Sequence, residues 1–467
     1  MKSLIYLNQY LFKYRLSIAI GLFFVILGNI FALIPANLIG RSFDLITQEI
    51  GQAKLNSNLD SLYYSLFIYA VLLVLVALIR GFFMFFMRQS IIVASRKMEY
   101  DLKNTVFKHY QYLSSSFYQK NDSGDLLNRI TEDVSRVRMY LGPAIMYTFN
   151  LFTLIALILS RMLMVSPLLT VIVLVPLPIL SFLIYKVSHK INLQSGLVQH
   201  KLSDLTNVAQ ETFSGIRLIK SFVREKQVLN YFKNNSIDYM NLNISLSRIN
   251  SIFFPLVLFL VGFSTLLTVY TGGVLAIKNY ISIGEVAEFI IYVNMLTWPV
   301  TSVGWVTEVI QRAAASQSRI NNFLNQKDYT IFYNSMTSLV QHKIDYQEIR
   351  LLNLSYEYNN TNILALKDIN LDLKINHIIG FVGAVGAGKS TMLKILCGIL
   401  KPSEGKFLFD DISHEQINWG QLRNDISYVS QDVFLFSDSI RNNILFGVED
   451  ISDSELMMVI KKTCLFD

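Results

Sequence analysis

The chain has 467 residues, of which 52% are hydrophobic and only 16% are charged, and its formal net charge is +7. Its length implies two or more domains, and its charged fraction, well below the roughly 25% of soluble domains, excludes an ordinary soluble enzyme. The positive charge comes with no arginine-rich stripe or recognition motif, so we expect no nucleic acid as a partner. The two cysteines, Cys397 and Cys464, imply neither a disulfide nor a metal site.

Six stretches are long and apolar enough to cross a bilayer, since a spanning helix needs about 20 apolar residues. The first of them follows basic residues at the N-terminus and is too long for a cleavable signal peptide, so we expect it to remain as an anchor. Prolines lie in or beside several of these stretches, which membrane helices tolerate. The expected spans are 17–39, 62–87, 141–165, 168–187, 252–277 and 286–310.

Lysine and arginine concentrate in two long segments, 88–138 and 186–248, which follow the second and fourth expected spans. Positively charged loops stay in the cytoplasm, so both segments and both termini are expected there. The sequence therefore predicts a multi-pass protein of the plasma membrane, which in bacteria is the inner membrane.

Both basic segments show helical periodicity that continues from the spans, which predicts helices reaching well beyond the bilayer. A polar stretch interrupts each segment near its middle, at 118–125 and 210–216. A short helix lying crosswise at each interruption would press on a domain in the cytoplasm. An ordinary helical hairpin loop accounts for the same pattern equally well.

Polar residues are few within the spans. Arg80 is costly if it meets lipid, so it is expected to face the bundle or to snorkel. We favour such a packing or snorkelling role over contact with a bound substrate. The phenylalanine and methionine run 82–87 is typical of lipid-facing or core side chains. On the sixth span, four residues are candidates for lining a central cavity: Asn294, Trp298, Thr301 and Trp305.

A polar, aperiodic stretch at 325–346 is interpreted as a linker between a transmembrane domain, 1–324, and a second domain, 347–467. Beyond the linker, apolar runs bounded in several places by glycine or Asx turns predict strands at 349–354, 366–373, 378–382, 406–409 and 426–429. Strands ahead of and around a glycine-rich turn and a helix indicate an α/β nucleotide-binding domain.

The glycine-rich turn fits the phosphate-loop pattern G-x-x-x-x-G-K-[ST] between an expected strand and an expected helix. Glycine lets backbone N–H groups converge on phosphate oxygens. Lys389 supplies a point charge and Ser390 a hydroxyl ligand for Mg²⁺, while the start of the helix attracts the anion. The expected nucleotide-binding residues of the loop are Gly383, Gly386, Ala387, Gly388, Lys389, Ser390 and Thr391.

The whole chain resembles an ABC exporter half-transporter of the multidrug-resistance type, in which six spans precede one ATP-binding domain. The segments 354–358 and 366–371 are similar to the family's adenine-stacking region, which makes Tyr358 the candidate for that contact. The segment 426–436 resembles the glutamine loop, so Gln431 is the candidate to touch Mg²⁺ or the attacking water. The segments 117–125 and 211–222 are similar to its two coupling-helix regions.

Two departures from the family pattern accompany this resemblance. Asn376 and His377 stand where the family has a Gly-Glu turn, and asparagine tolerates the left-handed geometry needed there. The sequence ends at Asp467, before the family's signature loop, Walker B aspartate, catalytic glutamate and switch histidine. We therefore expect an incomplete ATP-binding domain with little turnover, and an exposed edge where a Walker B strand belongs beside 378–382.

The resulting hypothesis is a helical membrane domain with six spans, followed by a C-terminally incomplete α/β domain that binds ATP and Mg²⁺. The resemblance implies a dimer with a second half-transporter, identical or different, in the lipid bilayer. It also implies a small hydrophobic or lipid-like substrate. Two alternatives remain open: an inert truncated subunit that binds ATP without hydrolysing it, and a lipid flippase that shares the mechanism but carries another cargo.

Overall fold

The computed structural model describes residues 2–52, 59–326, 346–358, 363–417, 419, 422, 425–431, 434–448, 451–463 and 465. The chain divides into two compact units, one formed by Met1–Gln111 and Asp122–Gln326, the other by Tyr112–Asn121 and Lys327–Asp467. Most of the expected linker, 325–346, and Cys464 lie outside the described residues.

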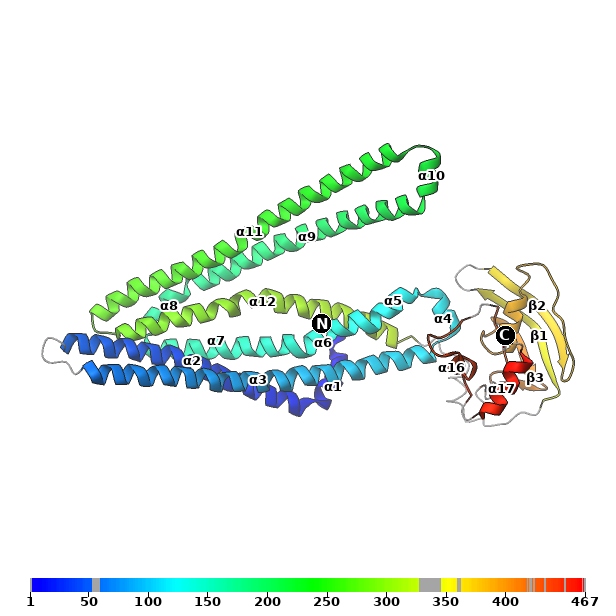
Figure 1. The fold of residues 1–467 in the computed structure, drawn as a ribbon, viewed down its shortest axis with the longest axis horizontal. Coiled ribbons are helices and arrows are strands. Elements are labelled where there is room, and N and C mark those ends of the chain that lie inside the picture. The colour runs from blue at the N-terminus through cyan, green and yellow to red at the C-terminus, as the bar shows by residue number, and fades with distance from the viewer. Residues whose placement is uncertain are drawn as a thin grey trace. The chain divides into compact units, whose positions relative to one another are not determined.

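The first unit is helical (Figure 1). It opens with a 3₁₀ turn, Lys2–Leu7, and π-helical turns at Arg129–Asp133 and Tyr140–Ala144 join its shorter helices. Its helices are α1 (Asn8–Lys13), α2 (Arg15–Gln52), α3 (Leu59–Tyr112), α5 (Ser123–Asn128), α6 (Val134–Met139), α7 (Ile145–Val165), α8 (Pro167–Leu174), α9 (Pro176–Ser214), α10 (Ile216–Ser221), α11 (Glu225–Ile277) and α12 (Ile283–Leu324).

Within the described residues, five helical segments are long and apolar enough to cross a membrane: Arg15–Gln48, Leu62–Tyr112, Ser123–Val165, Glu225–Ile277 and Ile283–Leu324. The chain is therefore a multi-pass membrane protein. The expected fourth span, 168–187, is not one helix but is divided between α8 and α9. The two helices meet beside Pro176 and Pro178, and proline has no N–H for the helical ladder and clashes with the preceding turn.

Several helices are much longer than a bilayer is thick, as expected for the two basic segments. The 54 residues of α3 extend about 80 Å at 1.5 Å per residue, compared with a hydrocarbon core of about 30 Å. In Figure 1, α9 and α11 run side by side to α10 at their tip. Lys201 of α9 holds the two together, since its Nζ lies 2.9 Å from Oδ1 of Asn235 and 3.1 Å from the carboxylate of Asp238.

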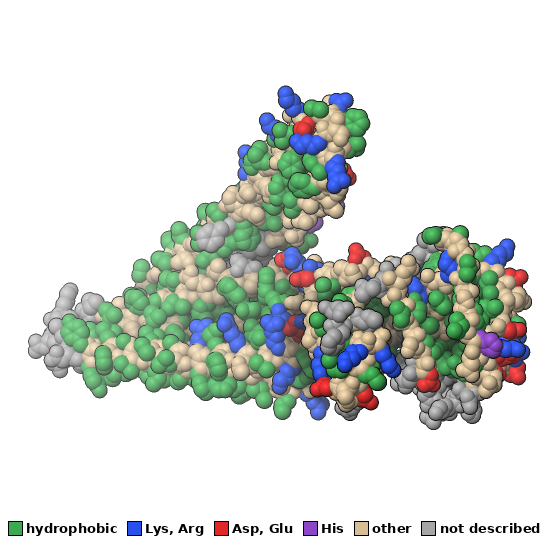
Figure 2. All heavy atoms as spheres, turned by 45° about the vertical axis from the view of Figure 1, so that its right-hand side comes forward, with side chains coloured by type: hydrophobic (Ala, Val, Ile, Leu, Met, Phe, Trp, Pro, Cys, Tyr) green, Lys and Arg blue, Asp and Glu red, His purple; other side chains and the backbone are tan. Residues whose placement is uncertain are grey.

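A short helix lies at each polar interruption, α4 (Ser115–Lys120) at the first and α10 at the second. Ser114 caps α4 with its side chain. On and beside α10, apolar side chains are exposed, among them those of Phe213, Leu218 and Phe222. Figure 2 shows basic side chains gathered at this end of the hairpin, whereas hydrophobic side chains cover most of the bundle face in view.

The core of the first unit joins α2, α7, α8, α11 and α12. It contains Ala36, Ile158, Met162, Leu169, Val173, Val257, Leu260, Val261, Phe289, Tyr292, Val293 and Leu296. At one end of this core, Asp44 of α2 caps α12, because its carboxylate accepts hydrogen bonds from Ser282 Oγ at 2.8 Å and from the Gly284 N–H at 2.7 Å. A Cβ on Gly284 would lie 2.0 Å from the Gly40 carbonyl oxygen, so only glycine permits this close approach.

The second unit contains a four-stranded sheet with the order β2-β1-β3-β4, and every neighbouring pair is antiparallel. Leu351 on β1 faces Leu371 on β2 and Phe407 on β3 in the register of the sheet. The strands are β1 (Glu348–Tyr358), β2 (Ile363–Lys374), β3 (Glu404–Phe409) and β4 (Ile412–Ser413), and the helices of this unit are α4, α14 (Lys389–Leu396), α16 (Ile440–Ile444) and α17 (Asp453–Lys462).

Two strand predictions are wrong. Neither 378–382 nor 426–429 is a strand. The three other predicted strands correspond to β1, β2 and β3. Ile378, Val382 and Val429 are almost fully exposed. Apolar runs of this kind belong to parallel sheets, which are covered on both faces, and no strand among the described residues pairs with them.

The core of the second unit lies between the sheet and α14. Trp419 is completely buried at its centre, with the rings of Phe407 and Phe409 about 6.0 and 5.9 Å away, and its Nε1 donates to the His414 carbonyl oxygen at 2.8 Å. Gly398, just after α14, has a φ of 66°, and a Cβ there would lie 2.3 Å from the Trp419 ring. The helix end therefore packs directly on the indole.

His414 is expected to make this core sensitive to acid. It is buried, its ring stacks on Phe407, and its ring nitrogens have no hydrogen-bond partner among the described residues. Burial holds the pKa of His414 below the usual value. The negative charge of Glu415 and the Phe407 backbone oppose this shift, and the positive charge of Lys401 adds a smaller lowering effect. The unfolded chain takes up the proton near pH ~6.5, so this contribution to stability is complete above that pH and is lost as the pH falls below it.

Thermal unfolding of the purified chain between pH 7.5 and 5.5 measures this effect. The wild type is expected to lose more stability over that range than His414→Phe, which removes the titrating group. Equal pH profiles for the two proteins would show that His414 is not the source.

Candidate nucleotide site and membrane cavity

The phosphate loop connects β2 to α14 through backbone angles that favour glycine. Gly386 and Gly388 have φ values of 83° and 84°, in the left-handed region that other residues seldom adopt. A Cβ on Gly388 would also lie 2.5 Å from the Ala365 carbonyl oxygen. A Cβ on Gly383 would lie 3.3 Å from that of Ala387, whose N–H donates to the Ala384 carbonyl at 3.2 Å. The loop is therefore a tight turn.

Lys389 is the first residue of α14, and its side chain folds back over the loop. Its Nζ donates to the carbonyl oxygens of Gly383 at 2.7 Å and of Ala384 at 2.8 Å. The ammonium group thus lies above the backbone that an anion would contact. Ser390 follows it in the first turn and is exposed, and the N–H groups of this turn have no intrahelical partner. The positive charge of Lys389 and the backbone N–H donors of the first turn therefore converge at the start of α14.

Tyr358 and Thr391 lie together beside this loop. The Tyr358 hydroxyl is 3.0 Å from Oγ1 of Thr391, and the ring meets that of Tyr356 edge-on at 5.0 Å. Thr391 is buried, so its hydroxyl joins β1 to α14. Tyr358 is thereby held next to the helix that begins at the phosphate loop, although adenine stacking by this ring stays a prediction.

Gln431 is exposed, and the described part of the chain gives it no hydrogen bond to the phosphate loop. Its assignment to Mg²⁺ or to the attacking water rests on the resemblance alone and stays a prediction. Asn376 has a φ of 60°, which agrees with the left-handed turn expected before the loop. The structure thus groups Tyr358 and Thr391 with the loop residues and leaves Gln431 unassigned.

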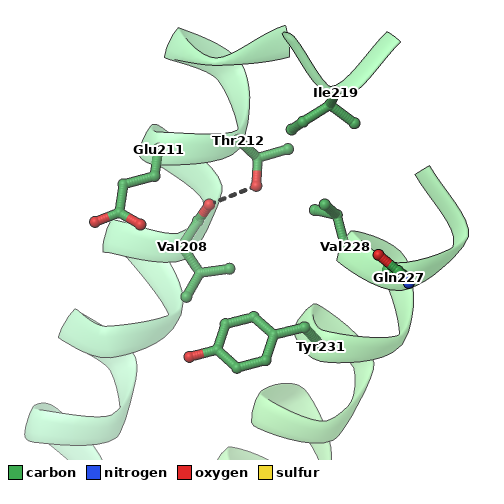
Figure 3. A pocket seen from close by; sticks show the side chains of 7 residues that line it. All are labelled: Val208, Glu211, Thr212, Ile219, Gln227, Val228 and Tyr231. Atoms are coloured by element: carbon green, nitrogen blue, oxygen red, sulfur yellow. Dashed lines mark hydrogen bonds between the residues drawn. The ribbon is translucent and has the colours of Figure 1, made fainter. Parts of the chain in front are cut away.

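A pocket of about 380 Å³ lies near the tip of the α9–α11 hairpin, and three of its lining residues, Glu211, Thr212 and Ile219, belong to the expected second coupling region. Figure 3 shows Val208 of α9 and Tyr231 of α11 facing each other across it, with Ile219 at one end and Glu211 turned away. Thr212 Oγ1 donates to the Val208 carbonyl at 2.6 Å. The tip therefore combines a hollow lined largely by apolar side chains with the exposed apolar side chains around α10.

A larger cavity of about 560 Å³ lies between α2, α3, α7 and α12. Of the four predicted cavity residues, Asn294 and Trp298 line it, whereas Trp305 packs against Tyr147 at 5.5 Å and is not part of the lining. The side chain of Thr301 lies outside the described residues. Arg80, for which we favoured a packing or snorkelling role, also lines the cavity.

Sequence reasoning missed Arg88, Asn29 and Asn150, which complete the polar part of the lining. Asn29 Nδ2 donates to Thr153 Oγ1 at 2.6 Å and to the Asn150 carbonyl at 3.3 Å, which ties α2 to α7. An asparagine inside an apolar span is itself a signal, because polar groups at this depth are costly unless they are paired.

Comparisons with known proteins agree with this arrangement of two parts. The family model described as "ABC transporter transmembrane region" matches residues 18–300, and the model described as "ABC transporter" matches residues 366–465. The second match covers the phosphate loop and α14.

Three relatives illustrate the similarity. The multidrug resistance-like ATP-binding protein MdlA of Buchnera aphidicola subsp. Schizaphis graminum is 31% identical over 434 residues, which are 92% of this chain and 71% of the relative. The probable multidrug resistance ABC transporter ATP-binding/permease protein YheI of Bacillus subtilis is 28% identical, over 96% and 74% of the two chains. The ATP-dependent lipid A-core flippase of Syntrophus aciditrophicus is 26% identical, over 82% and 63%.

The transmembrane family model alone covers more than half of the chain, and the Buchnera relative is matched over most of its length. With a bundle of membrane-length helices and a phosphate loop in one polypeptide, this chain belongs to the ABC transporter family, with the membrane and nucleotide-binding regions fused.

Proposed function

We propose that the chain is one half of an ATP-driven exporter of hydrophobic or amphipathic molecules. The observation that carries the proposal is the phosphate loop, with Lys389 over its carbonyl oxygens at the start of α14, in the same polypeptide as a multi-pass membrane bundle. The relatives named for multidrug resistance support export, because they match both regions.

The nucleotide in this proposal is ATP with Mg²⁺. The loop and the first turn of α14 hold its phosphates, Ser390 and Gln431 coordinate the metal ion, and Tyr358 stacks on adenine. The N- and C-termini and the nucleotide-binding region face the cytoplasm of the plasma membrane, because the long basic segments do. A second half-transporter, identical or different, completes the assembly.

Coupling in this proposal runs through α4 and α10. Phe213, Leu218 and Phe222 are largely exposed around α10, and apolar side chains gathered at a cytoplasmic tip favour docking against a protein surface. When ATP closes two nucleotide-binding domains, movement of these tips would be carried along α3, α9 and α11 to the spans.

Transport into inside-out membrane vesicles tests the proposal. Vesicles that contain the chain together with a second half-transporter as partner are expected to accumulate a lipophilic fluorescent dye when ATP and Mg²⁺ are added. The dye should stay outside with a non-hydrolysable ATP analogue, because resetting the transporter needs hydrolysis. Equal accumulation by vesicles that contain the partner alone would refute the proposal for this chain.

A further inference from the structure

The cavity between α2, α3, α7 and α12 carries positive charge without a compensating acid. Arg80 and Arg88 both line it, and no aspartate or glutamate is among the described residues of the lining. Among the described residues, neither arginine has a salt bridge, whereas Arg161 of α7 is paired with Glu288 of α12. Two guanidinium groups therefore share one cavity without a carboxylate partner.

The two arginines lie on one helix at a spacing that suits a single headgroup. They are eight residues apart on α3, which is about 12 Å along the axis and slightly more than two turns, and both line the same cavity. An unpaired guanidinium within a span, such as that of Arg80, is costly, and the planar fork of arginine binds phosphate and carboxylate oxygens with two parallel hydrogen bonds. An anion entering the cavity removes that cost.

The rest of the lining is suited to the apolar part of a bound molecule. Four methionines contribute flexible, polarisable side chains, and Trp298 offers a broad ring. The volume of about 560 Å³ lies within the usual range for small-molecule sites, about 300–1,000 Å³. The methionines are Met84, Met87, Met146 and Met295.

We propose that this cavity binds an amphiphile with an anionic headgroup, held by Arg80 and Arg88, whose apolar part lies against the methionines and Trp298. The inference rests on the proposed function and narrows its substrate class from hydrophobic molecules in general to anionic amphiphiles. A phospholipid and a soluble alkyl phosphate share this chemistry.

Binding of matched amphiphiles to the purified full chain in neutral detergent tests the proposal without nucleotide. The probes are dodecyl phosphate, dodecyl phosphocholine and dodecyl trimethylammonium, which differ only in the headgroup, each with a brominated tail that quenches tryptophan. The phosphate is expected to bind at least tenfold more tightly than the trimethylammonium compound. Trp298→Phe should remove most of the quenching, which assigns the signal to the cavity.

The double variant Arg80→Gln/Arg88→Gln is expected to lose the preference for the phosphate and to retain binding of the dodecyl tail. The matched control is Arg41→Gln, which changes an arginine of α2 outside the lining and should leave the preference unchanged. Arg80→Lys/Arg88→Lys should recover part of it, because it restores charge without the planar fork. Equal binding of the three probes, or a phosphate preference that survives the glutamine variant, would overturn the proposal.

Two further measurements distinguish a membrane lipid from a soluble amphiphile as the ligand. If quenching by brominated phosphatidylglycerol vesicles exceeds that by brominated phosphatidylcholine vesicles and depends on the arginines, the ligand is a membrane lipid. If only the soluble alkyl phosphate discriminates, it is a soluble amphiphile. Failure of ATP binding or of dye transport leaves these results untouched, so the proposed function and the cavity proposal fail independently.

Discussion

Lys389→Ala is expected to weaken ATP binding by about tenfold to a hundredfold. The variant removes the ammonium that lies 2.7 and 2.8 Å from the loop carbonyl oxygens of Gly383 and Ala384, and with it a charge-assisted hydrogen bond to phosphate worth about 1.5–3 kcal/mol. Photolabelling of the purified chain with an azido-ATP analogue, in competition with unlabelled ATP, measures the change.

Lys394→Ala is the matched control, because it removes the same charge from the last turn of the same helix. Its labelling should stay close to that of the wild type if the effect is local rather than a loss of general positive potential. Gly388→Ala provides a second test, which changes the shape of the loop and not its charge. The new Cβ would lie 2.5 Å from the Ala365 carbonyl oxygen at a φ of 84°, so the loop must distort and labelling should fall with all lysines in place. Undiminished labelling of both Lys389→Ala and Gly388→Ala would place the nucleotide elsewhere.

The difference between the loop and its flanking strand shows what the sequence can predict here. The phosphate loop and α14 depend on local properties: glycines that allow positive φ, and a helix that starts at Lys389. Both were predicted. The runs 378–382 and 426–429 were predicted as strands from their apolar side chains, but a parallel strand is formed by hydrogen bonds to neighbouring strands. Ile378 and Val429 are exposed because such neighbours are not among the described residues.

In the membrane region, too, the sequence predicts properties of single segments better than contacts between segments. Apolar length predicted the spanning helices, and periodicity predicted their long extensions, because both are properties of single segments. Val175, between α8 and α9, marks where two prolines divide an expected span. The cavity was predicted only in part, since Arg88 is assigned to it by the packing of α3 against other helices, and no pattern within α3 specifies those neighbours.

Glu288→Ala is expected to lower the free energy of unfolding by about 3 kcal/mol, near the lower end for breaking a buried ion pair. The Glu288 side chain is only 4% exposed, and Arg161, its partner at 3.3 Å, is 40% exposed, which reduces the cost. Glu288 also accepts hydrogen bonds from the Tyr292 hydroxyl at 2.5 Å and from Asn37 Nδ2 at 3.3 Å. Alanine therefore leaves groups of α2, α7 and α12 without their acceptor. Unfolding by sodium dodecyl sulfate in mixed micelles, followed by circular dichroism, measures the loss.

Glu308→Ala is the control on the same helix, because its ion pair with Arg312 is exposed on both sides and such pairs contribute at most about 1 kcal/mol. Glu288→Gln separates charge from part of the hydrogen bonding. Its single amide oxygen can still accept from the Tyr292 hydroxyl, while the attraction to Arg161 and the acceptor for Asn37 Nδ2, which bonds the other carboxylate oxygen, are lost. The double variant Glu288→Gln/Arg161→Gln should lose less stability than the sum of its single changes, because each single change leaves the other group unpaired. Strict additivity would mean that Glu288 and Arg161 do not stabilise one another. In that case Glu288 would act through its hydrogen bonds with Tyr292 and Asn37 and not through the ion pair.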